Sequence, residues 1–411
     1  MRKLFILLLL LITVNLFGDE IDRVARDNIH MREGPGCFYP VIMVLNKGAE
    51  IEIDKRAKDW LNVYCSDEKG WIFNNALKPA PAENNIFGNQ LDASKDHTIS
   101  QASVSAAVRG FAQKYLSNTD GDTAFLNNFD HMIITPQMYQ SFKDETYRNR
   151  DHKMIKKRYK DWKDFKYTGD FHITYYLEKT GFAVATRIAR KGVIDDQAKL
   201  QYINNVGTLI TEHSELNYYP IKYYIIKDQR PAAYATPIGM IFITEGLFKM
   251  VKNEAELACL LGHELGHVVR QHGYREIKKR KPRIAAQKAF QELDESIPGT
   301  DTTAVALSRL ANNMYEAATA KRQLKYEYQA DKCGAVYAYR AGYDPAALVD
   351  LLTRIKDNSE TDYVNFESNW EAYYIKDRIE RLEKFINKEL QRRKHLNVDN
   401  RYRFENTILN K

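Results

Sequence analysis

The pattern of apolar and polar residues changes along the chain from strand-like to helical. Between residues 21 and 80 the two types alternate with a period of two at 50–54 and again at 60–64, which is typical of strands with one buried face. Turns that contain glycine lie at 34–36 and 46–48. Several short strands in so small a segment predict an all-β barrel at 21–80.

The second half of the chain has apolar residues at helical spacing, with two strand-like interruptions. Asp195 or Asp196 is placed to cap a helix that runs to about His213. The strand-like stretches follow at 218–226 and 232–244. Helices mixed with a few strands predict the α+β class for this part of the chain.

A well-marked helix follows these strands. Asn253 and Glu256 have the spacing of an N-cap and its reciprocal partner. We expect this helix to run to His272 and to stop at Gly273, because glycine readily ends a helix. His272 would then cap the helix or interact with its dipole. A further long helix is expected to end near Gly342.

The beginning of the chain has the pattern of a secretory signal peptide. Arg2 and Lys3 precede an apolar stretch from Leu4 to Phe17, and a membrane-spanning helix needs about 20 apolar residues. We therefore expect residues 1–18 to be a signal peptide and the protein to be periplasmic or secreted. An uncleaved anchor is the alternative.

The predicted domain organisation follows these changes of pattern. After residues 1–18 we expect a small all-β barrel at 21–80, a linker and mixed segment of unknown role at 81–175, an α+β domain at 176–390 and a charged tail at 391–411.

Composition excludes several classes of protein. Twenty Gly and 11 Pro are too few for a collagen-like chain, and 26 Tyr with 18 Phe argue against a mostly disordered one. The 61 Lys and Arg against 54 Asp and Glu leave a formal charge of +7. This mild excess does not call for nucleic acid as a partner, although it permits weak attraction to anionic lipids or cell-wall polymers.

The four cysteines leave two interpretations open. In an exported chain, Cys37 could pair with Cys65, and Cys259 with Cys333. Four free buried thiols are the other interpretation, because the chain has large cores elsewhere.

One motif carries candidate chemistry. His263 and His267 are four residues apart on the expected helix and so lie on one face, close enough to share a metal ion. Glu264 between them can reach a water on that metal. Downstream, Glu327 and Asp331 also lie one helical turn apart, so that Glu327 can complete the metal shell while Asp331 accepts a hydrogen bond from a ligand histidine.

The sequences 263–267 (HELGH) and 326–331 (YEYQAD) resemble the zinc metallopeptidase family of the CAAX prenyl protease, the heat-shock protease HtpX and their periplasmic bacterial relatives. The likeness extends from about Thr180 to Leu382. It implies a mostly helical gluzincin domain with a small substrate-binding sheet and one zinc ion per chain. By this resemblance the site residues are His263, His267 and Glu327 as zinc ligands, Glu264 as general base and Asp331 as the partner of a ligand histidine.

The resemblance also implies a substrate-binding strand. The strand at 239–244 corresponds to an edge strand that pairs with extended substrate in such enzymes, which makes Gly239, Met240 and Ile241 candidates for substrate contact.

The chain departs from the family pattern near its last helix. Many relatives carry a His-Pro pair where this chain has Ala372-Tyr373. Tyr373, Tyr374 and Arg378 are candidates for stabilising a transition state there, with a structural role as the favoured alternative.

The N-terminal segment has a resemblance of its own. Residues 28–35, 47–48, 60–63 and 70–72 are similar to bacterial SH3-like domains. Such domains bind cell-wall or peptide ligands, or only pack against a catalytic neighbour, and both interpretations remain open.

We therefore expect an exported zinc-dependent metalloendopeptidase that acts in envelope protein quality control. Its partners would be protein or peptide substrates, with peptidoglycan or envelope proteins at the SH3-like domain. The inserted segment 273–322 could be a lid, a peripheral membrane contact or a plain solvated insertion. Two alternatives compete: a binding protein whose peptidase fold is a chaperone or scaffold, and a structural zinc site closed by Cys259 or Cys333.

Overall fold

The computed structural model describes residues 20–27, 29–57, 59–79, 98–100, 125, 133–148, 175–273, 275–276, 315–316, 319, 323–361, 372–390 and 398–403. The expectations for 1–18, for the linker after residue 79, for most of 81–175 and for most of the insertion at 273–322 lie outside these residues.

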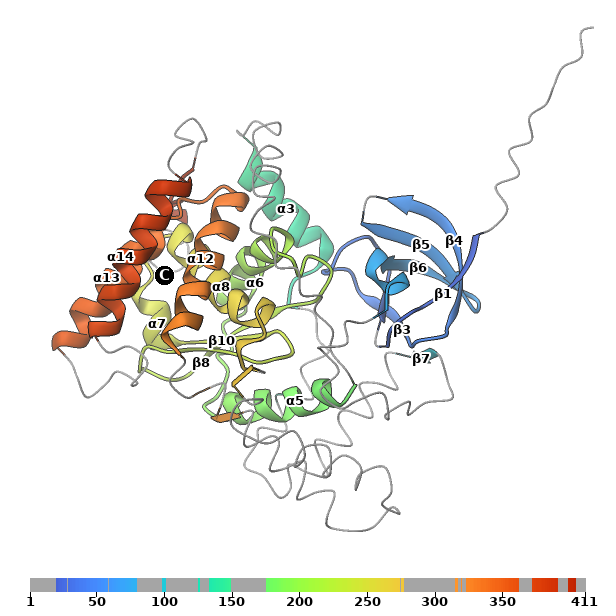
Figure 1. Ribbon diagram of the computed structural model, residues 1–411, viewed down its shortest axis with the longest axis horizontal. Coiled ribbons are helices and arrows are strands. Elements are labelled where there is room, and N and C mark those ends of the chain that lie inside the picture. The colour runs from blue at the N-terminus through green and yellow to red at the C-terminus, as the bar shows by residue number, and fades with distance from the viewer. Residues whose placement is uncertain are drawn as a thin grey trace, which may run out of the picture.

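The elements follow one another as the hydrophobic pattern indicates (Figure 1). The strands are β1 (Glu20–Arg23), β2 (Ile29–Arg32), β3 (Val41–Leu45), β4 (Glu50–Ala57), β5 (Trp60–Cys65), β6 (Glu68–Phe73), β7 (Thr98–Ser100), β8 (Lys222–Ile226), β9 (Ala233–Ala235) and β10 (Met240–Thr244). The helices are η1 (Asn74–Leu77), α3 (Pro136–Tyr147), α5 (Tyr175–Ala189), α6 (Gln197–Glu212), α7 (Glu245–Met250), α8 (Glu254–Val269), α12 (Leu324–Ala341), α13 (Ala347–Thr361), α14 (Ala372–Phe385) and η5 (Ile386–Leu390).

The N-terminal strands form one antiparallel sheet with its own core. Its strand order is β1-β4-β5-β6-β2-β3-β7. The alternation seen in the sequence sets the faces of β4, where Ile51 and Ile53 are buried and Glu50 is exposed. The sheet curls around a core that includes Met31, Leu45, Ile51, Val63 and Ile72 (Figure 1). The predicted small β-domain is thus present as a barrel-like antiparallel sheet.

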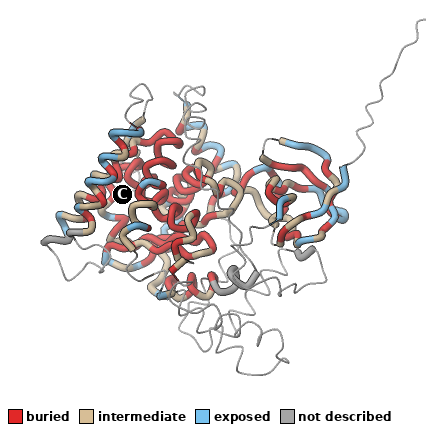
Figure 2. The backbone as a smooth tube through the Cα atoms, in the orientation of Figure 1, coloured by how far each residue is buried: buried red, intermediate tan, exposed pale blue. Residues whose placement is uncertain are grey.

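The second unit is α+β, as predicted, with helices around a three-stranded sheet. The order of this sheet is β8-β10-β9, with β8 parallel and β9 antiparallel to β10. Asp196 caps α6 by accepting a hydrogen bond from the backbone N–H of Lys199 at 3.1 Å. The buried backbone, red in Figure 2, is densest around α6, α8 and α12.

Two features of this sheet and its helices differ from the expectation. The strand at 239–244 is not an edge strand, because β10 is hydrogen-bonded to β8 on one side and to β9 on the other. Gly239, Met240 and Ile241 therefore have no free backbone edge for a substrate. The motif helix α8 also ends at Val269, with Arg270 as its C-cap, rather than at His272.

Glycines allow α8 and α12 to approach very closely. A Cβ at Gly334 would lie 2.6 Å from the carbonyl oxygen of Cys259 and 3.0 Å from the backbone nitrogen of His263. A Cβ at Gly266 would lie 2.6 Å from Cβ of Cys333. The absence of these side chains brings α12 against the motif helix and so fixes where its acidic residues lie.

Helix α3 joins the barrel to the second unit, which gives a structural role to part of the segment at 81–175. The hydroxyl of Tyr139 donates to Glu212 on α6 at 2.6 Å. On the other side, the ring of Tyr139 lies 4.7 Å from that of Phe38 in the barrel. Phe73 of β6 stacks on Tyr218 at 4.4 Å, so two aromatic pairs hold the barrel against its neighbour.

Part of the expected charged tail belongs to the packed domain. The backbone carbonyls of Asn400 and Arg401 accept hydrogen bonds from the first N–H groups of α8, at Ala255 and Glu254. Arg403 binds the buried Glu254 carboxylate through two nitrogens, at 2.7 and 2.8 Å. Residues 398–403 thus satisfy the open end of the motif helix.

The cysteines follow the second interpretation of the sequence. Cys37, Cys65, Cys259 and Cys333 are all buried and free, so neither predicted disulfide forms. Across the part of the chain described here, we find no helix with the length and apolar character needed to span a bilayer.

Candidate functional site

The two motif histidines and Glu327 converge from two packed helices. His263 and His267 lie one turn apart on α8, and their Nε2 atoms are 3.1 Å apart. Glu327, in the first turn of α12, places one carboxylate oxygen 3.5 Å from His263 Nε2 and the other 3.5 Å from His267 Nε2. Both imidazoles are buried, and Glu327 is partly exposed.

The spacing of these atoms fits a zinc ion. Four ligands at zinc–ligand distances of about 2.0–2.1 Å in a tetrahedron are separated by about 3.3 Å, close to the 3.1 and 3.5 Å found here. Within the described residues this is the one group of three metal-binding side chains, and no cysteine joins it. Three protein donors leave a fourth position for water or substrate, as in catalytic zinc sites.

Glu264 lies beside the donors on the same helix. Its side chain is 3% exposed, and its Oε1 atom is 3.8 Å from His263 Nε2. The carboxylate is therefore next to the predicted metal position and largely shielded from bulk water. It can accept a proton from a water at the fourth position.

Asp331 orients His263. One oxygen of Asp331 lies 2.9 Å from Nδ1 of His263, so the other ring nitrogen of His263 faces the metal position. Burial lowers the pKa of His263, but hydrogen bonds with Asp331 and Glu327 outweigh it and raise the pKa to about 9. The two carboxylates thus favour a positive charge beside them.

Arg378 of α14 compensates the carboxylates of the site. Its guanidinium donates to both oxygens of Asp331 at 2.7 and 2.9 Å and lies 3.2 Å from Glu327. Burial raises the pKa of Asp331, but the opposing charge and hydrogen bonds of Arg378 hold this pKa below its usual value. Arg378 therefore has the structural role that the sequence favoured, and it acts directly on two residues of the centre.

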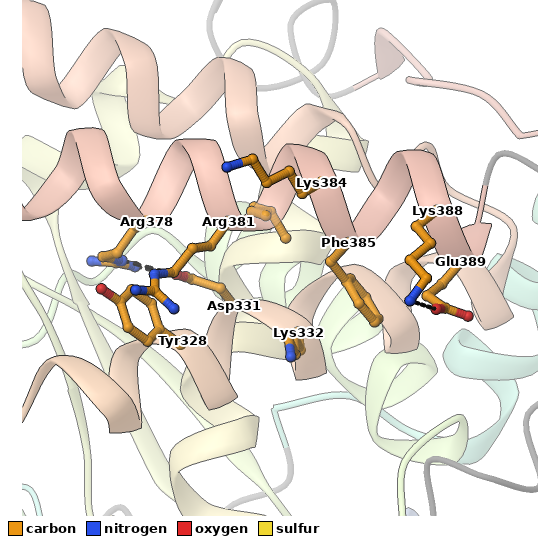
Figure 3. A pocket seen from close by; sticks show the side chains of 10 residues that line it. Tyr328, Asp331, Lys332, Arg378, Arg381, Lys384, Phe385, Lys388 and Glu389 are labelled. Atoms are coloured by element: carbon orange, nitrogen blue, oxygen red, sulfur yellow. Dashed lines mark hydrogen bonds and ion pairs between the residues drawn. The ribbon is translucent and has the colours of Figure 1, made fainter.

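A pocket of about 380 Å³ opens between α12 and α14 beside this ion pair (Figure 3). Asp331 and Arg378 form one end of it, and Phe385 and Lys388 lie toward the other. Basic side chains from both helices line the pocket, among them Lys332 and Lys384.

His272 is a site residue that the sequence analysis assigned to the wrong task. It does not cap α8, since that helix ends at Val269. Instead its buried ring contacts His267, with the two Nδ1 atoms 2.9 Å apart. The available signal in the sequence was a histidine five residues after His267. Its contact with His267 depends on a turn of the backbone that the spacing does not reveal.

The other candidates lie away from this centre or outside the described side chains. Gly239, Met240 and Ile241 are enclosed in the sheet as stated above, and the outer strand β9 lies against α8 in their place. The side chain of Tyr373 is outside the described residues, and Tyr374 is partly buried. The Cys259 thiol lies 3.7 Å from the backbone carbonyl of Asp344 and packs in the core.

Known proteins resemble part of this chain. The model of peptidase family M48 matches residues 197–391. A putative beta-barrel assembly-enhancing protease of Vibrio cholerae is 28% identical over 172 residues, which are 40% of this chain and 34% of the relative. The beta-barrel assembly-enhancing protease of Escherichia coli K12 is 25% identical over 171 residues, 41% of this chain and 34% of its own.

A third match comes from a eukaryote. The mitochondrial metalloendopeptidase OMA1 of Schizosaccharomyces pombe is 29% identical over 154 residues, which are 38% of this chain and 43% of the relative. The chain thus spans about a third of the length of the bacterial relatives named above and somewhat less than half of this one. Together with the paired histidines and Glu327, the match of residues 197–391 to peptidase family M48 supports a zinc metalloprotease domain in this part of the chain.

Proposed function

We propose that the chain is an exported zinc metalloendopeptidase that hydrolyses peptide bonds of envelope proteins. The observation that carries this proposal is the convergence of two imidazole nitrogens and one carboxylate at 3.1–3.5 Å, with Glu264 beside them. His263, His267 and Glu327 would hold one zinc ion. A zinc ion in such a site supplies Lewis acidity, which acidifies a water molecule and polarises the scissile carbonyl.

The residues of this chain perform the proton transfers. Glu264 accepts the proton of the attacking water as the water oxygen bonds to the carbonyl carbon. Glu264 then delivers that proton to the leaving nitrogen, so that the amine departs neutral and the carboxylate is restored. Asp331 holds the imidazole of His263 in place, and Arg378 fixes Asp331 and Glu327.

The substrate strand is reassigned to β9. Among the described strands, β9 pairs with β10 on one side only, and it lies against α8. An extended polypeptide added along its outer side would pass next to the helix that carries the motif. Ala233, Tyr234 and Ala235 therefore replace residues 239–241 as the backbone that receives substrate.

The names of the bacterial relatives support a role in the cell envelope. Two of them are called beta-barrel assembly-enhancing proteases. With the signal-peptide pattern at 1–18, this favours misassembled envelope proteins as substrates and the periplasmic branch of the family rather than its membrane-integral prenyl-protease branch. The N-terminal sheet would be an SH3-like module that contacts peptidoglycan or a partner protein.

Proteolysis of an unfolded substrate tests this function. Zinc-loaded protein from residue 19 onward should cleave casein, and Glu264→Gln should bind one zinc and lose turnover, since an amide cannot accept the proton. Glu327→Gln should instead lower the zinc content, measured by chelator competition. Normal turnover by Glu264→Gln would contradict the mechanism, and zinc bound without cleavage in the wild type would favour the scaffold alternative.

A further inference from the structure

The two histidines of the metal centre are oriented by chemically different partners. Nδ1 of His263 lies 2.9 Å from a carboxylate oxygen, that of Asp331. His267 instead faces another imidazole, with its Nδ1 atom 2.9 Å from Nδ1 of His272. The second ring nitrogen of His272 lies 2.9 Å from Oε1 of Gln329. A chain of three side chains therefore leads away from the metal position.

We propose that His272 is a positioning residue for zinc binding, which accepts the Nδ1 proton of His267 and has its own tautomer set by Gln329. The proposal rests on the metal-binding role of His267 proposed above. A hydrogen bond between two ring nitrogens needs one donor and one acceptor. Because Nε2 of His267 faces the metal position, its proton is on Nδ1, and Nδ1 of His272 must be the acceptor.

Gln329 completes this assignment. With Nδ1 unprotonated, neutral His272 carries its proton on Nε2. That nitrogen faces the carbonyl oxygen of the Gln329 amide, which can only accept. Both hydrogen bonds are therefore satisfied in one direction, from His267 to His272 and from His272 to Gln329.

The fold holds His272 in place from two sides. The backbone at Gln271 is left-handed, with φ of 52°, so the chain turns back after α8 and places His272 beside His267. The ring of Tyr326 stacks on His272 with centroids 4.4 Å apart and planes 17° apart. His272 itself is fully buried. Such a placement restricts the ring to the orientation that the hydrogen bonds require.

The same short stretch of α12 serves both histidines. Glu327 contacts both metal-facing nitrogens, Asp331 binds His263, and Tyr326 with Gln329 fix His272. His272 and Gln329, which orient His267, are neutral groups. They therefore add no further negative charge beside the zinc ion. A carboxylate in that place would reduce the Lewis acidity of the ion.

A matched pair of variants tests the acceptor role. In His272→Asn, the side-chain oxygen takes the place of Nδ1 and can accept the proton of His267, whereas His272→Leu has similar size and no acceptor. In chelator competition with zinc alone, we expect the Leu variant to bind zinc 10- to 100-fold more weakly and the Asn variant to stay within about threefold of the wild type. Equal affinity of the two variants, whether retained or lost, would overturn the proposal.

Two further measurements separate positioning from simple packing. Both variants lose the stack on Tyr326, so the stability of the metal-free proteins to urea should fall similarly while only the Leu variant loses zinc affinity. Nitrogen NMR of the zinc-loaded wild type should show His272 protonated on Nε2 and not on Nδ1. The opposite tautomer or a doubly protonated ring would overturn the proposal without any variant.

Gln329→Met provides a variant with little risk of misfolding, because Gln329 is only partly buried. It removes the acceptor for His272 and should weaken zinc binding about three- to tenfold. Unchanged affinity would overturn the role of Gln329. The control is His267→Ala: if this variant kept wild-type zinc affinity, the metal site itself would be wrong, which is distinct from a failure of His272.

Discussion

Arg378 is the residue on which the buried charges of the metal centre depend. It binds Asp331 through two nitrogens and lies 3.2 Å from Glu327, and it is 2% exposed. Removing one partner of a buried ion pair destabilises a protein by about 3–5 kcal/mol. We expect Arg378→Met to lower the free energy of unfolding of the metal-free protein by about 3 kcal/mol, measured by urea denaturation at pH 7.

Arg381→Met is the matched control for this substitution. Arg381 lies one turn further along α14, is exposed and pairs with Asp377 at 3.2 Å on the surface. Exposed pairs contribute about 0–1 kcal/mol, so this change should be small. A loss for Arg378→Met no larger than that for Arg381→Met would contradict the role assigned to the buried pair.

The residues of the site differ in how far the sequence could predict them. Helical spacing puts His263 and His267 on one face and Glu327 with Asp331 on another helix, and the family resemblance supplied their roles. The contacts of Arg378 and His272 could not be predicted in this way. Arg378 comes from a helix 47 residues beyond Asp331, and His272 contacts His267 only because the backbone turns at Gln271.

The distance between helices α8 and α12 depends on Gly334. An added Cβ would stand 2.6 Å from the carbonyl oxygen of Cys259, which is backbone and cannot rotate away. Gly334→Ala must therefore push α12 from α8 and move Glu327 with it. Overpacking of this kind costs about 1–3 kcal/mol, and we expect a loss of that size in urea denaturation together with weaker zinc binding in chelator competition.

Gly273→Ala is the control for Gly334→Ala, because its added Cβ would meet nothing closer than Pro237 at 3.8 Å. It should change neither stability nor zinc affinity appreciably. If Gly334→Ala behaved in the same way, the close packing of these two helices would not be what positions Glu327.

The sequence predicted the secondary structure of each segment better than the position of that segment in the fold. The caps Asp196 and Asn253 were confirmed because they act on their own helices. The position of β10 between β8 and β9 was missed, since its five buried residues fit a central strand but alternation alone does not order strands. The segment 398–403 was taken for a charged tail because Arg401 and Arg403 look solvated until Glu254 is found beside them.

The whole molecule is two units joined through aromatic contacts. The pairs Phe38–Tyr139 and Phe73–Tyr218 link the barrel to α3 and to the segment after α6. A third contact, His30 with Tyr219, has centroids 6.3 Å apart. The residues of each pair are remote from one another in the sequence. The hydrophobic pattern could therefore predict the secondary structure of each unit, but it could not show that the barrel packs against the peptidase domain.

His30 makes this junction sensitive to acid. Burial, together with the nearby charge of Arg32, lowers the pKa of His30 to about 3. The unfolded chain has a histidine pKa of about 6.5, so between these values it binds a proton that the folded protein does not. The contribution of His30 to stability is therefore complete above pH 6.5 and is lost as the pH falls toward 3.

His30→Asn isolates this effect. Nδ1 of His30 lies 3.1 Å from a guanidinium nitrogen of Arg32, and the asparagine oxygen can accept the same hydrogen bond without titrating. Between pH 7.5 and 5.0, urea unfolding followed by tryptophan fluorescence, to which Trp60 and Trp71 of the barrel contribute, should show the wild type losing up to about 2 kcal/mol more than the variant. Other buried groups, such as His213, whose pKa burial also lowers, contribute equally to both proteins. Identical pH dependence in the two proteins would show that the proton on His30 does not act at the junction.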